Sequence, residues 1–227
     1  MNLAVFESSS HHLSVALSCG GEIRERGANI ANGGSTQLLP WFQELMAEAG
    51  IALSALDALA FGAGPGGFTG LRLACGLAQG LALGLDLPLL GVCGLEALAL
   101  QSGPGRVVAA IDARMGEVYY GFYAVHGEET EILGAPACAA PPNLPQLPPG
   151  EGWTGCGDGF LANPDLWRGA LSVRRGDLFP TANAVARLAE PRLRRGEGVD
   201  AALAAPLYVR DKVALTTAER LARGGVR

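Results

Sequence analysis

Residues 61–83 read FGAGPGGFTGLRLACGLAQGLAL and decide how this sequence folds. The apolar segment 58–64 predicts a buried strand that runs into a loop of glycine and proline, and a helix is expected from about residue 70 to 85. A glycine-rich loop at a helix start often binds phosphate, and it also lets two backbones approach closely. The loop has neither the lysine of GxxxxGK[ST] nor the spacing of GxGxxG, so neither nucleotide-binding pattern is present.

Small residues mark two opposite faces of the helix that follows this loop. Gly76, Gly80 and Gly84 recur every four residues on one face, and alanines occupy the other. A glycine inside a helix costs about 1 kcal/mol relative to alanine. Close packing of another element is therefore the favoured explanation, ahead of a phosphate site in the loop. The run 71–90 is apolar enough to suggest a membrane span, but polar residues and a proline interrupt it, which favours a buried helix of a soluble protein.

The rest of the chain alternates strand and helix patterns. Strands are expected at 3–7, 13–18, 22–28, 88–92, 106–112 and 118–125, and helices at 37–50, 95–101 and 181–190. Each half opens with a strand, a short polar turn and a second strand, which suggests a degenerate duplication. The pattern predicts an α/β fold with mixed sheets, in lobes of residues 1–103 and 104–227. It leaves open whether the C-terminal segment packs back on the first lobe.

Charge is unevenly distributed along the chain. The net charge is −5, with 5 basic and 15 acidic residues up to Asn163 and 12 basic and 7 acidic residues after it. An ordinary arginine-rich surface is the favoured interpretation of the second part, and a contact with RNA or an acidic partner is the alternative. Five cysteines without a CxxC spacing and an N-terminus without a signal-peptide pattern favour a reducing cytoplasm.

Residues with catalytic chemistry are sparse. The histidines form no HExxH or HxxxH pattern, so no metal site is predicted. No nucleophile motif such as GxSxG is present. Four carboxylates at strand ends or turns could hold magnesium or act as a base, although each could equally be an ordinary turn residue. These are Glu7, Asp112, Glu117 and Asp158.

Several segments together resemble the TsaB family, also called YeaZ. They are GAGPGGFTGLRLACGLAQGLA, LLGVCGLEALA, AAIDARMGEVYYGFY and APLYVRDKVA, and the resemblance spans nearly the whole chain. Two segments depart from the family pattern. The first strand ends in Glu7-Ser8-Ser9 where an Asp-Thr-Ser type sequence is usual, and Gly33-Gly34-Ser35-Thr36 replaces a histidine that often precedes Ser-Glu.

The resemblance implies an actin/Hsp70-like (ASKHA) fold of two related lobes, with mixed sheets flanked by helices. It also implies a role in making N6-threonylcarbamoyladenosine (t6A) at position 37 of tRNAs that read ANN codons. This chain would be a non-catalytic scaffold for a TsaD-type catalytic subunit, together with a TsaE-type ATPase. It would bind no cofactor alone, since ATP and a metal ion are expected in the partner subunits. It would form a homodimer when alone, meet tRNA only through the complex, and work in the cytoplasm without a membrane.

Two groups of site residues follow from the residues and the resemblance together. The expected partner interface consists of Leu38, Leu39, Phe42, Leu45, Met46, Arg72, Leu73, Gly76, Leu77 and Gly80. A degenerate phosphate loop would consist of Glu7, Ser8, Ser9, Gly64, Gly66, Gly67, Thr69 and Gly70. Two enzymatic alternatives remain open. One is an ATP-dependent phosphotransferase of the same fold, with residues 155–160 (GCGDGF) as its second nucleotide loop, and the other is a degenerate metallopeptidase.

Overall fold

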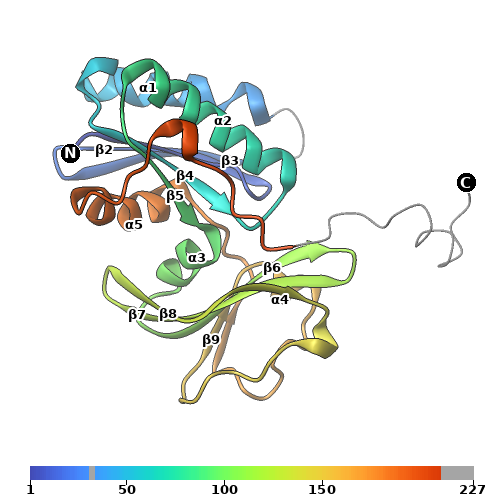
Figure 1. The fold of residues 1–227 in the computed structure, drawn as a ribbon. Helices are drawn as coiled ribbons and strands as arrows, with labels where there is room; N and C mark the ends of the chain where they lie inside the picture. The colour runs from blue at the N-terminus through green and yellow to red at the C-terminus, as the bar shows by residue number, and fades with distance from the viewer. Residues whose placement is uncertain (31–33, 211–227) are drawn as a thin grey trace, which may run out of the picture.

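The chain folds into two lobes, each built on a five-stranded mixed sheet (Figure 1). This computed structural model describes residues 1–30 and 34–210. The first sheet has the order β3-β2-β1-β4-β5. Its strands are β1 (Leu3–Glu7), β2 (His12–Cys19), β3 (Glu22–Asn29), β4 (Ala58–Gly64) and β5 (Leu89–Cys93). The apolar strands β1 and β4 pair in parallel at its centre and are buried along their whole length, as expected for strands covered on both faces.

The second sheet repeats this topology with the order β8-β7-β6-β9-β10. Its strands are β6 (Gly105–Arg114), β7 (Glu117–His126), β8 (Glu129–Ala139), β9 (Thr154–Cys156) and β10 (Val173–Arg175). In both sheets the first strand opens a three-stranded antiparallel meander and also pairs in parallel with the fourth strand. The same connectivity twice confirms two related lobes and the actin/Hsp70-like architecture.

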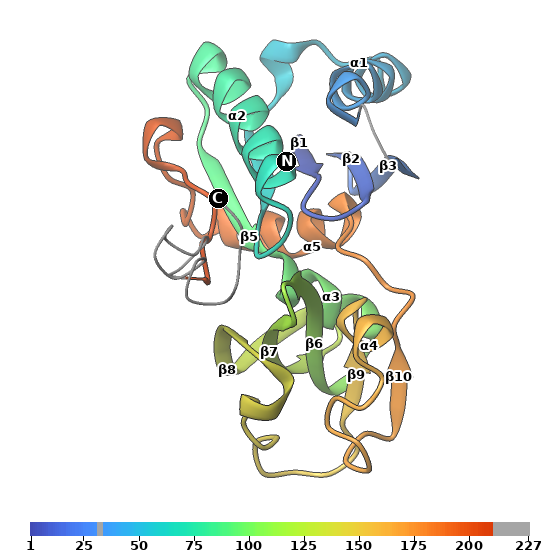
Figure 2. The ribbon, with the colours of Figure 1, turned by 90° about the vertical axis from the view of Figure 1, so that its right-hand side faces the viewer.

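Two helices cross between the lobes. α3 (Gly94–Ser102) follows the first sheet but packs on β6, β7, β8 and β9 of the second. α5 (Ala182–Arg194) follows the second sheet and packs on all five strands of the first. α3 and α5 contact each other between the sheets (Figure 2). The second lobe therefore begins at β6, whereas α5 and η4, which follow it in sequence, pack on the first lobe.

Helices α1 (Leu38–Ala49) and α2 (Phe68–Leu85) cover the other face of the first sheet. α1 ends at Gly50, whose φ of 66° is the left-handed conformation that favours glycine at a helix C-terminus. The short helix η4 (Ala201–Leu203) packs beside α2, where the Gln79 side chain donates hydrogen bonds of 2.9 Å to the Ala201 and Ala204 carbonyl oxygens.

The structure corrects the sequence prediction mainly in the second lobe. β8 was not expected, because Gly134 and Pro136 interrupt its alternation and its register against β7 shifts twice. The short elements β9, β10, α4 (Gly159–Ala162) and the 3₁₀ turns η1 (Gly34–Thr36), η2 (Leu53–Ala55) and η3 (Pro141–Asn143) were also missed. α5 continues beyond the expected end, through Pro191 to Arg194. Gly33 and residues 211–214 of the C-terminal motif lie outside the described residues.

Candidate functional site

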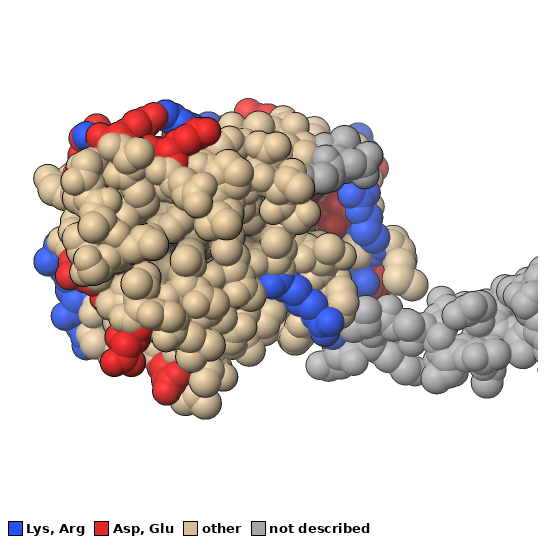
Figure 3. All heavy atoms as spheres, turned by 90° about the horizontal axis from the view of Figure 1, so that it is seen from above, with Lys and Arg blue, Asp and Glu red and all other residues tan. Residues whose placement is uncertain are grey.

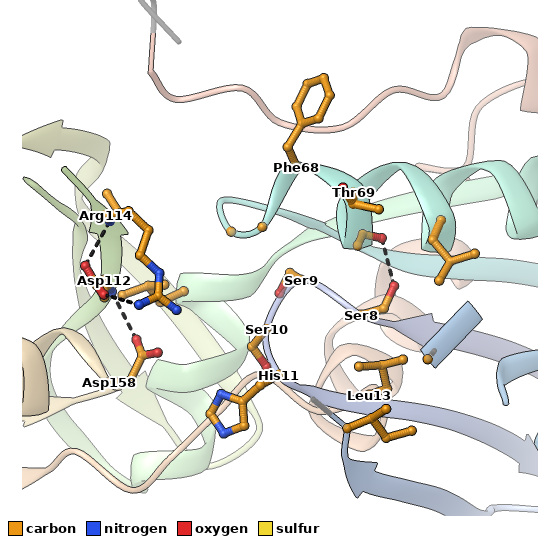
Figure 4. Close-up of a pocket in the computed structure, with 18 of the residues that line it drawn as sticks. Ser8, Ser9, Ser10, His11, Leu13, Phe68, Thr69, Asp112, Arg114 and Asp158 are labelled. Carbon is orange, nitrogen blue, oxygen red and sulfur yellow. Dashed lines mark hydrogen bonds and ion pairs between the residues drawn. The ribbon is translucent and has the colours of Figure 1, made fainter. Parts of the chain in front are cut away.

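A cleft of about 620 Å³ opens between the lobes. The turn between β1 and β2 and the N-terminal end of α2 line it from the first lobe. The end of β6, Tyr119 of β7 and Asp158 line it from the second lobe. Figure 4 shows the two walls facing each other across the cleft, with His11 opposite Asp158. The duplicated topology explains this arrangement, because the first hairpin of each lobe is turned toward the other.

The second-lobe wall carries two carboxylates, each of which accepts a hydrogen bond from a main-chain N–H. The Asp112 main-chain N–H donates to Asp158 Oδ1 at 3.0 Å, and the Arg114 main-chain N–H donates to Asp112 Oδ1 at 2.8 Å. The Arg114 guanidinium also pairs with Asp112 Oδ2 at 3.1 Å. Burial raises the pKa of Asp158 above its ordinary range. This acidic wall is unfavourable for a bare phosphate group.

The glycine-rich loop on the opposite wall is closed against its own chain. The Gly67 N–H donates to the Ser9 carbonyl oxygen at 2.7 Å, and the Ser8 hydroxyl donates to the Gly70 carbonyl oxygen at 2.8 Å. A Cβ atom at Gly66 would lie 2.5 Å from the Ser9 carbonyl oxygen, and one at Gly70 would overlap the Ser8 carbonyl oxygen. These two glycines are therefore required by the close approach of the β1–β2 turn.

The predicted phosphate-loop residues separate into two groups. Six of them line the cleft: Ser8, Ser9, Gly66, Gly67, Thr69 and Gly70. Gly64 and Glu7 do not. Gly64 has a φ of 106° and faces Leu71 and the main chain of Leu207. Binding of a phosphate by the six cleft residues stays a prediction.

Glu7 lies beneath the cleft rather than in it. Its carboxylate is fully buried, accepts a hydrogen bond from the Ser9 main-chain N–H at 2.6 Å, and lies where a Cβ atom at Gly62 would be. Burial is the largest influence on Glu7 and raises its pKa, while the hydrogen bonds from Ser9 oppose the shift. Glu7 lies at the end of β1, and its side chain is directed at β4.

Two further features considered in the sequence are the glycine-rich segment 155–160 and a metal site. In the segment 155–160, a Cβ atom at Gly157 would overlap the Ala110 carbonyl oxygen and one at Gly159 would lie 2.8 Å from the Ala110 carbonyl carbon. Packing on β6 therefore accounts for these glycines without a nucleotide. Within residues 1–30 and 34–210, no group of three or more His, Cys, Asp or Glu side chains is arranged to hold a metal ion.

The exposed face of α2 is the most distinctive surface of the first lobe. Its buried residues are Leu71 and the small side chains Ala74, Cys75, Ala78 and Ala82. Its opposite face holds the exposed Gly76, Gly80 and Gly84, and a Cβ atom at any of them would meet nothing within 4 Å. No contact within the described chain therefore accounts for these three glycines.

Apolar side chains border this glycine face. Leu83 of α2 is 60% exposed, and Leu203 of the neighbouring η4 is 77% exposed. Leu73 and Leu77 are half-buried, and Arg72 is exposed at the N-terminal end. Figure 3 looks down on the first lobe and shows a broad uncharged area with charged groups mainly at its margins. By length and composition α2 could cross a membrane, but only 28% of it is buried here, so the expected buried helix is instead a half-exposed one. We name the exposed surface of α2 from Arg72 to Leu83, together with Leu203, the α2 face.

Most α1 residues of the interface prediction are buried in the isolated chain, so that the interface stays a prediction. Leu38, Phe42, Leu45 and Met46 are 0–6% exposed, because they form the stripe that packs α1 against the core of the first lobe. Leu39 is 41% exposed and is the only α1 residue of the prediction that remains on the surface. The apolar residues of α1 recur at helical spacing because they face the core. From the sequence, we had expected fewer of them to fit in one core-facing stripe and had assigned the rest to an interface.

The arginines of the second part of the chain are largely neutralised within the protein. Among the described residues from 168 to 195, each arginine has an acidic or main-chain carbonyl partner. They are Arg168, Arg174, Arg175, Arg187, Arg192, Arg194 and Arg195. This pairing favours the ordinary surface interpretation of their charge over an RNA contact. The basic residues beyond position 210 lie outside the described residues.

Comparison with known proteins identifies the family. The family model of TsaD, described as tRNA N6-adenosine threonylcarbamoyltransferase, matches residues 30–154. The tRNA threonylcarbamoyladenosine biosynthesis protein TsaB of Escherichia coli (strain K12) is 37% identical over an alignment of 226 positions, and the match covers 94% of this chain and 96% of that protein. The chain belongs to the TsaB (YeaZ) family.

Solved structures agree with this assignment. YeaZ from Pseudomonas aeruginosa superimposes with a TM-score of 0.85 at 38% identity and covers 91% of this chain and 99% of its own. A second structure from the same organism, described as an uncharacterized protein with similarity to peptidase YeaZ, gives a TM-score of 0.86 over 92% of this chain and 99% of that one. The TsaB match covers nearly the whole chain, so the resemblance seen in the sequence is confirmed.

Proposed function

We propose that this chain acts in the biosynthesis of threonylcarbamoyladenosine in tRNA as a non-catalytic partner subunit. In this proposal a TsaD-type subunit transfers the threonylcarbamoyl group from threonylcarbamoyl-AMP to N6 of adenosine 37 in tRNAs reading ANN codons. This chain binds that subunit and acts as a scaffold for its catalytically active form. Family membership supports the pathway, through the relatives named as TsaB.

The α2 face is the observation that carries the scaffold role. Three helical glycines together cost about 2–3 kcal/mol relative to alanine, and the isolated chain gains no packing from them. Glycines at four-residue spacing let a second helix approach closely, and exposed apolar area marks a site of protein contact. A partner helix that packs against Gly76, Gly80 and Leu83 would explain both features.

The family match indicates what this partner looks like. The TsaD model aligns with residues 30–154, which include α1 and α2, so a TsaD-type protein carries an equivalent pair of helices. Two related chains can join through equivalent surfaces around a two-fold or pseudo-two-fold axis. The α2 face would thus serve a homodimer when the chain is alone and a heterodimer when TsaD is present, and the two assemblies would compete.

The remaining components belong to the partners in this proposal. ATP and a metal ion would bind to the TsaD-type and TsaE-type subunits, and tRNA would reach this chain only through the complex in the cytoplasm. The closed glycine loop and the acidic cleft wall support a chain that does not use nucleotide itself. The paired arginines of the second part support an indirect relation to tRNA.

The experiment that tests the partner surface uses two matched exposed leucines. Leu83→Glu places a carboxylate on the α2 face, and Leu161→Glu places one on the second lobe, where Leu161 is 65% exposed. Because both sites are exposed, both variants should fold, as circular dichroism can verify. Only Leu83→Glu should lose binding to the TsaD-type subunit in sedimentation and fail to restore t6A in cells depleted of the wild-type chain. Normal binding by folded Leu83→Glu would refute this surface.

The non-catalytic role has a separate test. The purified chain should not transfer threonylcarbamoyl from threonylcarbamoyl-AMP to tRNA, since the proposal assigns the transfer chemistry to the partner. Mass spectrometry of digested tRNA measures the product, with the reconstituted complex as the positive control. Transfer by this chain alone would overturn the scaffold role and leave the pathway assignment intact.

A further inference from the structure

The segment after η4, residues 204–210, crosses from the first lobe to the second, and we name it the strap. In Figure 1 it is the red segment that runs from the helix turn beside α2 down toward β6. At the first lobe, the Leu207 N–H donates to the Ala63 carbonyl oxygen at 2.7 Å. Ala63 lies near the end of β4, directly before the glycine-rich loop. The strap is therefore bonded to the strand that positions one wall of the cleft.

At the second lobe, Arg210 binds the turn between β6 and β7. Its guanidinium donates to the Ala113 carbonyl oxygen at 2.9 Å, pairs with the Glu117 carboxylate at 2.6 Å and lies 5.5 Å from the centre of the Tyr119 ring. The Arg210 side chain is only 14% exposed. The turn itself contains Arg114 with a φ of 61°, a left-handed conformation that non-glycine residues adopt only with support from their surroundings. Arg210 supplies such support from outside the lobe.

Between these two anchors the strap contacts α2. The Tyr208 ring lies 6.2 Å from the Phe68 ring, and its hydroxyl accepts a hydrogen bond from Arg72 Nε at 3.3 Å. Arg72 begins the α2 face, four residues before Gly76. Phe68 and Tyr208 are 48% and 50% exposed. A partner that packs on the α2 face would reach these two rings next, because they continue the same surface toward the cleft.

We propose that the strap is a latch that sets the width of the cleft and couples it to occupancy of the α2 face. Arg210 fixes the β6–β7 turn, and with it the Asp112 wall, relative to the first lobe. A partner bound on the α2 face confines Tyr208 and so holds the latch closed. The existence of the latch is independent of the proposed function, whereas the coupling rests on it.

The latch is tested on the isolated full chain by hydrogen–deuterium exchange. Arg210→Ala removes the guanidinium contacts, while Glu117, 39% exposed, can be rehydrated, so local loosening rather than unfolding is expected. Amides of residues 112–118 should exchange about tenfold faster, the effect of losing a charge-assisted hydrogen bond. Arg195→Ala removes a surface ion pair on an arginine that is 61% exposed and should change no cleft amide.

Unchanged exchange at residues 112–118 in folded Arg210→Ala would overturn the latch. If that variant does not fold, Arg210→Lys replaces it, because lysine keeps the charge but cannot bridge the carbonyl and the carboxylate as the planar guanidinium does. Faster exchange confined to the turn supports the latch in this variant too, and wild-type exchange overturns it.

The coupling is tested by adding the TsaD-type subunit. In the wild type, exchange should slow both on α2 and at residues 112–118, and in Arg210→Ala it should slow on α2 alone. Slowing on α2 without any change at 112–118 in the wild type would overturn the coupling while supporting the proposed function. Absence of slowing on α2 would instead contradict the proposed contact surface and, with it, the coupling.

Discussion

Replacing Gly80 by alanine should stabilise the isolated chain and weaken its association with the partner. A Cβ atom at this position meets nothing within 4 Å in the structure. The new methyl group therefore introduces no clash in the monomer, and the helix gains the difference in intrinsic propensity, about 1 kcal/mol. For a chain of this size, that gain corresponds to a rise in Tm of about 2–4 °C.

The opposite sign is expected for association. If a partner helix packs closely over Gly80, a methyl group there overfills the contact and costs about 1–3 kcal/mol, which lowers the association constant roughly 5-fold to 150-fold. Thermal melting of the chain, diluted until it is monomeric, and sedimentation with the TsaD-type subunit measure the two effects. Leu161→Ala, which trims an exposed side chain on the second lobe, should leave association unchanged.

Two results would refute this reasoning. A fall in Tm would show that the glycine face is already occupied within the folded chain. A rise in Tm with unchanged association would show that the glycines have a reason other than close approach of the partner. The combination of a more stable monomer and a weaker complex is specific, because an ordinary destabilising substitution would lower both quantities.

Three further predictions concern the first lobe and its junction with the second. Gly70→Ala should destabilise the chain by about 2 kcal/mol or more, because the new Cβ atom would overlap the main chain of Ser8. The control Gly67→Ala, whose Cβ atom would lie 3.4 Å from its nearest neighbour, should melt close to the wild type. Equal melting temperatures of the two variants would contradict this prediction. Burial raises the pKa of Glu7 above its ordinary 4.5, so this group favours folding at low pH and loses that contribution as the pH rises through its folded pKa. Glu7→Gln should remove this loss, so the stability of the variant relative to the wild type, measured in urea melts, should grow from about pH 4 to pH 8. A difference between the two proteins that stays constant with pH would argue against a buried titrating carboxylate. Arg192→Met should lower the free energy of unfolding by about 3 kcal/mol, because the Glu96 side chain, 3% exposed, would be left buried without its cation. Adding Glu96→Gln to this variant should recover much of the lost stability. A loss below about 1 kcal/mol in the single variant would show that the pair acts like a surface ion pair.

Local patterns were reliable where one segment determines its own structure. The apolar segments of β1 and β2, the buried run of β4 and the C-terminal glycine of α1 were all evident in the residues. The second lobe was harder to predict, because β8 is interrupted by Gly134 and Pro136 and its shifts of register are set by the neighbouring strand. Strands of three residues such as β9 and β10 contain too few side chains to show a period.

For the candidate site, too, the sequence identified residues whose roles only the tertiary contacts defined. The four carboxylates were visible as residues at strand ends, but their environments differ: Glu7 is buried under β4, Asp112 and Asp158 share the cleft wall, and Glu117 pairs with the strap. Arg210 could not have been singled out, because nothing in its sequence neighbours indicates that it contacts a turn nearly a hundred residues away. The pairing of the other arginines was equally hidden.

The sequence by itself determined the lobe architecture, the family and the unusual glycines of α2, because periodicity, turn residues and motifs are local properties of the chain. Only the tertiary structure decided what each glycine is for. Gly66 and Gly70 make room for the chain's own β1–β2 turn, whereas Gly76 and Gly80 face open space. It also decided that the apolar stripe of α1 is core while the face of α2 is surface. The physical reason is that a missing side chain creates space whichever neighbour uses it, and the identity of that neighbour is set by contacts between segments distant in sequence.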